Sequence, residues 1–196
     1  MNLNVKLKGL KAEEYIENSL GYSLSMLKPF PKFILIETID ACNARCIMCG
    51  IDFDSKKGVL MNNDLFGKIR KEISQQKDHV EKILLYLSGE PLLDKHIHHK
   101  IESMKNAGVK GVNIATNASL LDEKRAVQLI ESKLDEIYIT LDSLDRDVYE
   151  AIRVGLKFET VFKNIMEFIR IRNKLNSNMI IRLQMVLQEI NRAETS

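Results

Sequence analysis

The sequence predicts an α/β fold whose strands are parallel. From Phe33 onward, short runs rich in β-branched residues alternate with longer amphipathic runs, the pattern of repeated βα units. Hydrophobic residues make up 45% of the 196 positions, which is enough for one sizeable core. Five units over this stretch give roughly 33 residues each, the spacing of a (β/α)8 barrel, but eight such units need about 250 residues. A closed eight-unit barrel therefore does not fit.

The individual elements follow this alternation. Strands are predicted at residues 33–38, 82–87, 111–115, 136–141 and 179–187. Helices are predicted at residues 62–76, 95–107, 122–132 and 158–175, with Gly108 as a helix stop signal. Residues 1–31 are interpreted as an N-terminal extension, with a short helix at 11–20 and an extended entry at Lys28-Pro29-Phe30-Pro31.

Alternating polarity in the strands points to a lined cavity. In the predicted fifth strand, Arg182, Gln184 and Val186 share one face, opposite an apolar face. Parallel strands that are covered on both faces usually have continuous apolar sequences. The polar residues here therefore indicate that one face of the sheet contacts water or a ligand. For any single strand, the polar pattern is explained equally well by an edge position that exposes polar groups to water. Several strands agree, which favours a cavity wall. The residues assigned to that wall are Tyr86, Tyr138, Arg182 and Gln184.

Composition and charge exclude some classes of function. Lys and Arg number 29 against 27 for Asp and Glu, and the net charge of +2 gives no electrostatic argument for binding nucleic acid or an anionic membrane. No apolar run approaches the ~20 residues that span a bilayer, and the first residues lack the apolar core of a signal peptide. We therefore expect a cytoplasmic protein with no membrane or nucleic-acid partner.

Three cysteines lie close together in the chain, at Cys42, Cys46 and Cys49. An odd number of thiols spaced so closely makes a poor disulfide framework but is typical of a metal-binding loop. In an irregular loop at a strand end, the three sulfurs can converge on one 4Fe-4S cluster. Such a cluster keeps one iron without a protein ligand, and that iron is open for direct binding of a cofactor or substrate.

A zinc site is the alternative interpretation of the three cysteines. It would need a fourth ligand, for which the candidates are His96, His98 and His99. These histidines start a polar helix, where clustered histidines are more often solvated surface than ligands. The iron-sulfur cluster is therefore favoured.

The segment at residues 39–50 resembles the signature of the radical S-adenosylmethionine (radical SAM) superfamily, which has three cysteines at this spacing. The residue before the last cysteine is usually aromatic or bulky in that family. Met48 holds this position here, and its flexible thioether can pack beside an adenine ring. The resemblance implies a six-unit partial barrel, a (β/α)6-type TIM-like fold. It also implies that the open iron binds the amino and carboxylate groups of S-adenosylmethionine, whose reductive cleavage gives methionine and a 5′-deoxyadenosyl radical.

Further family-like segments follow in order, each at the carboxyl end of a predicted strand, where α/β folds bind ligands. Ser88-Gly89-Glu90-Pro91 resembles the Gly-Gly-Glu-Pro segment that receives the cofactor's amino group, with Ser88 in place of the first glycine. Thr116-Asn117 resembles the family's Thr-Asn-Gly, with Ala118 in place of glycine. An ordinary turn or helix cap is the competing interpretation of these two. Thr140-Leu141-Asp142-Ser143 resembles a Ser-Leu-Asp-Gly segment whose hydroxyl group helps to hold the cofactor.

Arg153 lies in a stretch that is similar to a recurrent stretch of the family. The other matching residues of that stretch are Tyr149, Gly155, Phe158 and Asn164. Arg153 is able to pair with the cofactor carboxylate, since a guanidinium binds a carboxylate with two parallel hydrogen bonds. An exposed helix arginine is the competing interpretation.

Together these resemblances imply a candidate site. The cluster ligands are Cys42, Cys46 and Cys49. The cofactor-binding residues are Met48, Ser88, Gly89, Glu90, Asn117, Thr140, Asp142, Arg153 and Gln184. No catalytic residue is assigned. The implied substrate is a peptide, a sugar or another small molecule, and the implied electron donor is a reductant such as flavodoxin or ferredoxin.

The resemblance covers residues 32–192 and is strongest to the SPASM-type branch, which carries a C-terminal extension with auxiliary iron-sulfur clusters. We expect this chain to lack that extension. We expect an N-terminal extension at residues 1–31 and a radical SAM core at residues 32–196 whose barrel is truncated after the fifth strand. The expected activity is cleavage of S-adenosylmethionine for hydrogen abstraction from a substrate. A truncated, non-catalytic or partner-dependent iron-sulfur fragment is the alternative.

Overall fold

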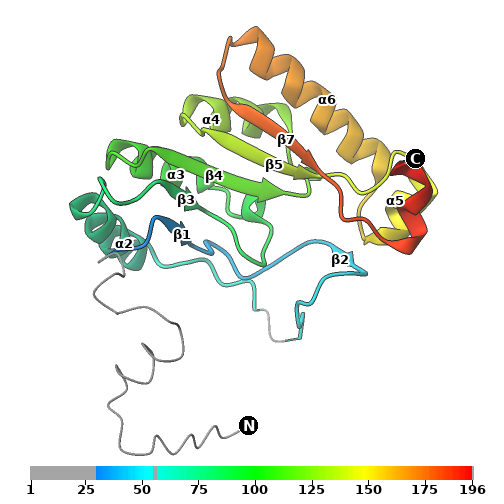
Figure 1. Cartoon of the computed structure of the whole chain (residues 1–196), viewed down its shortest axis with the longest axis horizontal. Helices are drawn as coiled ribbons and strands as arrows, with labels where there is room; N and C mark the ends of the chain where they lie inside the picture. Colours follow the sequence, from blue (N-terminus) through cyan, green and yellow to red (C-terminus); the bar gives the residue numbers. More distant parts are fainter. Residues whose placement is uncertain (1–29, 55–56, 196) are drawn as a thin grey trace, which may run out of the picture. The chain divides into compact units, whose positions relative to one another are not determined.

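The computed structural model describes residues 30–54 and 57–195. Its centre is a sheet of five strands in the order β1-β3-β4-β5-β7 (Figure 1). These strands are β1 (Phe33–Leu35), β3 (Lys82–Leu84), β4 (Gly111–Thr116), β5 (Glu136–Thr140) and β7 (Ile180–Gln184). Every pairing in this sheet is parallel, so all five strands end at the same edge. The predicted α/β fold with five parallel strands is confirmed.

Helices connect the successive strands of the sheet (Figure 1). They are α2 (Asn63–Gln75), α3 (Ile97–Asn106), α4 (Glu123–Glu131), the short α5 (Arg146–Ile152) and α6 (Phe158–Lys174). Helix α3 packs on β4 and against α4, which in turn packs against α6. Crossovers of this kind return the chain to the same end of the sheet before each strand. The loops that follow the strands therefore gather at one edge.

The first two strands are shorter than predicted. Single hydrogen bonds extend the ladder, from the Ile36 N–H to the Leu84 carbonyl at 2.8 Å and from the Leu85 N–H to the Asn113 carbonyl at 2.9 Å. Beyond these bonds, the segments that follow β1 and β3 leave the sheet and enter loops. Residues that the sequence assigns to strand ends thus belong to the loops at the edge of the sheet.

Burial alternates along the interior strand β5. Ile137 and Ile139 are fully buried, whereas Tyr138 and Thr140 on the opposite face are half-buried. The alternation is lost in β7, where even the apolar Leu183 is 55% exposed. Within the described sheet, β7 is flanked by β5 alone. The apolar core therefore lies against β3, β4 and β5.

Two very short strands were not predicted from the sequence. β2 (Arg45–Cys46) pairs antiparallel with β6 (Arg153–Val154), so that Cys46 lies opposite Arg153. The Ile47 N–H also donates to the Ile152 carbonyl at 3.0 Å. Backbone hydrogen bonds therefore hold the cysteine-bearing segment against the residues that follow α5.

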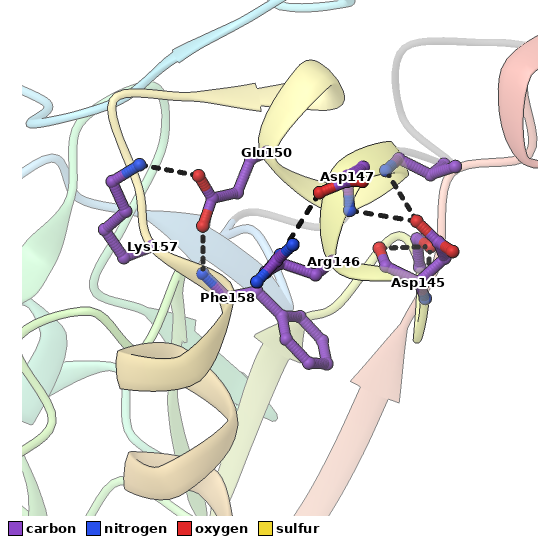
Figure 2. Close-up of polar contacts among 8 residues, drawn as sticks. Asp145, Arg146, Asp147, Glu150, Lys157 and Phe158 are labelled. Carbon is purple, nitrogen blue, oxygen red and sulfur yellow. Dashed lines mark hydrogen bonds and ion pairs between the residues drawn. The ribbon is translucent and has the colours of Figure 1, made fainter.

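Side-chain caps determine where three of the helices begin. Asn62 Oδ1 accepts from the Asp64 N–H at 2.7 Å before α2, and Asp122 Oδ1 accepts from the Arg125 N–H at 2.8 Å before α4. Figure 2 shows the cap of α5, where Asp145 accepts from backbone N–H groups of the first turn. Such a cap satisfies amide groups that the helix leaves unpaired, and its loss costs about 1 kcal/mol.

Two further predictions concern the N-terminal residues and membrane-spanning helices. The N-terminal extension expected at residues 1–31, with its helix at 11–20, lies almost wholly outside the described residues. Among the helices that the structure does describe, none has the length and apolar character needed to cross a membrane.

The interior strand β5 supplies a test of the fold. Ile137 is fully buried in β5, so Ile137→Ala removes packed methyl groups and leaves a cavity, which should cost about 2–5 kcal/mol of unfolding free energy. Ile180 of β7 is 48% exposed, and Ile180→Ala should cost less than about 1 kcal/mol. Urea unfolding followed by circular dichroism measures both. Equal losses for the two variants would contradict this assignment of the core.

Candidate functional site

The loops at the carboxyl edge of the sheet line a cavity of about 280 Å³. Its walls come from the loops after β1 and β3, the ends of β4 and β5, the start of β6 and the segment after β7. Most predicted site residues line it: Cys42, Cys46, Met48, Cys49, Ser88, Gly89, Glu90, Asn117, Thr140 and Arg153. Asp142 and Gln184 are not among its lining residues. Strand ends that are distant in sequence thus meet at one site.

Two backbone hydrogen bonds stabilise the loop that carries the cysteines, one between the two ends of the loop and one within it. The Met61 N–H donates to the Thr38 carbonyl at 2.8 Å, and the Cys49 N–H donates to the Cys46 carbonyl at 3.0 Å. Cys42 and Cys46 are half-buried, while Cys49 is exposed. Burial raises the pKa of the Cys42 thiol above its ordinary value. Three free thiols are thereby presented toward one cavity from a single loop.

Glu90 ties the loop after β3 to the end of β4. Its side chain is buried, and its oxygens accept from Thr116 Oγ1 at 2.6 Å and from the Asn117 N–H at 2.8 Å. Burial raises the pKa of this carboxyl, and the hydrogen bonds from Asn117 and Thr116 offset that rise only in part. The Glu90 N–H also donates to the Ala41 carbonyl at 2.7 Å. One residue therefore joins three loops of the site.

Gly89 packs directly against the cysteine loop. A Cβ at this position would lie 2.2 Å from the Ile39 carbonyl oxygen and 2.8 Å from the Ala41 carbonyl oxygen, so only glycine fits. Glu37 holds the same turn, because its Oε1 accepts from the Ser88 N–H at 2.9 Å, the Ser88 hydroxyl at 2.6 Å and the Gly89 N–H at 2.7 Å. Sequence reasoning missed Glu37. The only signal was one acidic residue at the end of an apolar strand.

Ala118 shows why glycine is common at its position. Its φ of 59° lies in the left-handed region, which is unfavourable for residues with a Cβ. Two hydrogen bonds hold it there: its N–H donates to Thr116 Oγ1 at 3.0 Å, and its carbonyl accepts from Asn164 Nδ2 at 2.9 Å. Asn117 reaches the cysteine loop, where its Nδ2 donates to Asn43 Oδ1 at 3.0 Å. Asn164 therefore supports this turn rather than lining the cavity.

Arg153 contacts a cysteine sulfur directly. It is only 9% exposed, its Nη1 donates to Cys46 Sγ at 3.3 Å, and its Nε donates to the Asp142 carboxylate. Burial lowers the pKa of the guanidinium, but Asp142 and Cys46 raise it above its ordinary value. The Tyr149 hydroxyl lies near these groups and is buried with no hydrogen-bond partner among the described residues. The exposed-arginine interpretation is therefore wrong.

The two predicted residues outside the cavity have other contacts. Asp142 is fully buried behind the wall, where it binds Arg153 and accepts from the Val186 N–H at 2.7 Å. Gln184 is exposed on β7, and its backbone carbonyl accepts from the Leu141 N–H at 2.9 Å. In this structure neither side chain reaches the cavity. The alternation of residues along the strand did not predict that the Asp142 side chain points away from the cavity.

The polar face of the sheet carries an ion-pair cluster that involves the first residues of β3 and β5. Glu136 is buried on β5, and its carboxylate accepts from Lys82 Nζ at 2.8 Å and from Arg182 Nε. Burial alone would raise the pKa of Glu136, but the two cations hold it below its ordinary value. Of the four residues assigned to the substrate wall, Tyr86 borders the cavity, while Tyr138, Arg182 and Gln184 do not. Glu136, which organises this face, was not identified from the sequence.

The donor set at the cavity fits an iron-sulfur cluster. All three of its thiols are free, and they border the same cavity. In the described part of the chain, no three His, Cys, Asp or Glu side chains are arranged to hold a single metal ion. The histidines that a zinc site would recruit lie at the start of α3 and do not line this cavity: they are His96, His98 and His99. The three thiols therefore fit the cluster of the prediction, and the histidines proposed as a fourth zinc ligand lie elsewhere.

Comparison with known sequences identifies relatives. The family model described as the Radical SAM superfamily matches residues 36–191. A protein named "Probable GTP 3′,8-cyclase" from Methanococcus maripaludis strain C5 is 36% identical over 131 residues, which cover 66% of this chain and 43% of that protein. The GTP 3′,8-cyclase of Thermodesulfovibrio yellowstonii is 33% identical over 139 residues, which cover 69% and 42%. The chain spans less than half the length of these relatives.

Comparison with solved structures gives the same fold. BtrN in complex with AdoMet and 2-DOIA aligns with a TM-score of 0.60 and 20% identity over 86% of this chain and 63% of BtrN. Streptococcus suis SuiB bound to the precursor peptide SuiA aligns with a TM-score of 0.66 and 19% identity over 96% of this chain and 41% of SuiB. At such identities the likeness concerns the fold, and it confirms the predicted partial TIM-like barrel.

The family match contains the three cysteines and every loop that lines the cavity. Because it extends over most of the chain, it reflects a shared fold and not only a shared motif. The cofactors of this family are a 4Fe-4S cluster and S-adenosylmethionine, the two that the sequence predicts. The chain belongs to the radical SAM superfamily.

Proposed function

We propose that this chain is the cluster- and cofactor-binding core of an enzyme that cleaves S-adenosylmethionine reductively. One observation carries the proposal: the three free thiols and the Ser88–Glu90 loop border a single cavity at the carboxyl edge of the sheet. When bound, the 4Fe-4S cluster supplies the electron that cleaves S-adenosylmethionine to methionine and a 5′-deoxyadenosyl radical, which abstracts hydrogen from a substrate. The protein binds and orients the cofactor and shields the radical from water and oxygen.

Cluster binding is assigned to the cysteine loop. Cys42, Cys46 and Cys49 supply three thiolates and leave one iron for the cofactor. The protein's own contacts hold the loop, because β2 pairs with β6 and Gly89 packs against the Ile39 carbonyl. A pre-arranged loop reduces the conformational entropy that binding would otherwise cost.

Cofactor binding is assigned to the remaining lining of the cavity. The Gly89-Glu90 loop receives the amino group, for which the buried Glu90 carboxylate provides negative charge nearby. Met48 packs beside the adenine ring, and Thr140 at the end of β5 contributes a hydroxyl group. Asn117 lines the same cavity and is hydrogen-bonded to Asn43 of the cysteine loop. For the buried Asp142 and the exposed Gln184 we propose supporting roles in place of direct contact.

The substrate is assigned to the polar face of the sheet, on which Tyr86 borders the cavity. The same face carries the Lys82–Glu136–Arg182 cluster. The relatives above 30% identity carry the name GTP 3′,8-cyclase, whereas the structural neighbours bound to a peptide or to 2-DOIA are at about 20%. A nucleotide is therefore the first substrate to test, ahead of a peptide or a sugar. Flavodoxin or ferredoxin is the proposed electron donor.

A second candidate is an iron-sulfur unit that needs a partner for turnover. The observation that favours it is the exposed apolar surface at β7 and the segment after it. Leu183, Met185 and Leu187 are 55%, 41% and 56% exposed. Unburied apolar side chains of this size commonly mark a contact surface. Turnover by the isolated chain distinguishes the two candidates.

The test of the proposed function is cofactor cleavage. The chain is reconstituted anaerobically with iron and sulfide, reduced with dithionite and given S-adenosylmethionine, and 5′-deoxyadenosine is measured by chromatography. We expect product from the wild type and none above background from Cys46→Ala. A fully reconstituted chain that forms no 5′-deoxyadenosine would favour the partner-dependent unit.

Iron content tests the cluster ligands. Cys46→Ala should abolish stable cluster assembly, because two thiolates are too few to hold a 4Fe-4S cluster. His96→Ala is the matched control and should leave the iron content unchanged, since His96 does not line the cavity. Iron and zinc are measured by mass spectrometry after anaerobic purification. Stoichiometric zinc that is lost in both variants would instead establish a zinc site.

The turn at Gly89 gives a test of cofactor binding. Gly89→Ala places a Cβ 2.2 Å from the Ile39 carbonyl oxygen, so the turn must shift away from the cysteine loop. We expect affinity for S-adenosylmethionine to fall at least about tenfold, a change of about 1.4 kcal/mol in binding free energy. Gly67→Ala is the control, because nothing lies within 4 Å of its Cβ. Equal affinity in both variants, measured by calorimetry on the reconstituted protein, would refute this role for the turn.

A further inference from the structure

Arg153 is held against Cys46 by the backbone as well as by its side chain. The β2–β6 pairing places Cys46 directly opposite Arg153, and the Nη1 to Sγ distance of 3.3 Å is a hydrogen bond to sulfur. The Ile47 N–H to Ile152 carbonyl bond continues the pairing on the next residues. The contact therefore follows from the local fold and does not depend on a freely rotating surface arginine.

A second anchor fixes the guanidinium from behind. The Asp142 carboxylate is fully buried; one oxygen accepts from Arg153 Nε and the other from the Val186 N–H at 2.7 Å. Asn191 Nδ2 donates to the Asp142 carbonyl at 2.7 Å and to the Val186 carbonyl at 3.0 Å. A buried ion pair needs such additional bonds to offset its loss of hydration. Asp142 thus keeps Arg153 pointed at the sulfur.

The charge on this donor is permanent. A guanidinium does not lose its proton in proteins, so Cys46 faces a positive charge at any working pH. Since Arg153 is 9% exposed, salt and water screen that charge only weakly. Hydrogen bonds to the sulfur ligands and the net charge nearby are among the factors that set the reduction potential of an iron-sulfur cluster. A positive donor stabilises the reduced cluster, which carries one more electron.

We propose that Arg153, held by Asp142, is a positioning residue that raises the reduction potential of the cluster bound at Cys46. The inference rests on the proposed function, because it requires that a cluster binds. The step concerned is the passage of one electron from an external one-electron reductant to the cluster, in which no bond forms or breaks. Arg153 makes that step more favourable.

The test compares two arginine variants of the reconstituted full chain. Arg153→Gln removes the charge at Cys46, whereas Arg146→Gln removes the same charge from the exposed surface of α5, where Arg146 pairs with Asp147 (Figure 2). The midpoint potential is measured by anaerobic redox titration, followed by electron paramagnetic resonance, without S-adenosylmethionine. Arg153→Gln should make reduction about tenfold less favourable, a shift of about 59 mV to more negative potential for one electron. Arg146→Gln should leave the potential unchanged.

Arg153→Lys covers the case in which Arg153→Gln assembles no cluster. Its ammonium keeps the charge but lacks the planar fork that bonds Asp142 and Cys46 together, so a smaller negative shift is expected. A wild-type potential in every variant that assembles a cluster overturns the inference. An unchanged potential combined with weaker binding of S-adenosylmethionine also overturns it and makes Arg153 a cofactor ligand. Failure of the wild type to bind any cluster refutes the proposed function itself, and the inference with it.

Discussion

The contact between the Gly89 turn and the cysteine loop determines where every other part of the cavity lies. At this contact the two backbones touch: there is no room for a Cβ at Gly89, and the Glu90 N–H donates to the Ala41 carbonyl at 2.7 Å. The Glu90 carboxylate then bonds Thr116 and Asn117 at the end of β4. Three successive strand ends are thereby joined by short-range contacts that leave little freedom for the thiols or for a bound cofactor.

On the side of the cavity formed by β6 and the segment after β7, a buried ion pair holds the wall in place. Arg153 and Asp142 form a buried pair whose remaining hydrogen-bonding groups bind Cys46 and the Val186 N–H. Val186 itself lines the cavity, so the segment after β7 is linked to a cysteine sulfur through two side chains. A buried charge is costly unless it is fully paired, and here the pair also bonds a cysteine sulfur and the backbone of a residue that lines the cavity. The shape of this side of the cavity therefore depends on the same few groups that pair the charge.

The sequence predicted the five strands because each is an apolar run bounded by turn signals, and it predicted the cysteines because their spacing is distinctive. The two-residue strands β2 and β6 have no periodicity to detect, so the Cys46 to Arg153 contact was not foreseen. Asp142 was assigned to the cofactor although its side chain lies behind the wall. Glu37 and Glu136 act through partners that are distant in sequence, and only the folded chain brings those partners together.

The most direct test of this account concerns the iron that, in the proposed function, the three cysteines leave open. The reconstituted wild-type chain is reduced anaerobically, and its electron paramagnetic resonance spectrum is recorded with and without S-adenosylmethionine. Direct binding of the cofactor at the cluster changes the electronic environment of the irons, so the account predicts a clear shift of the spectrum at saturating S-adenosylmethionine. A spectrum that stays the same, while calorimetry shows that the cofactor is bound, would contradict the claim that thiols and cofactor share one cavity.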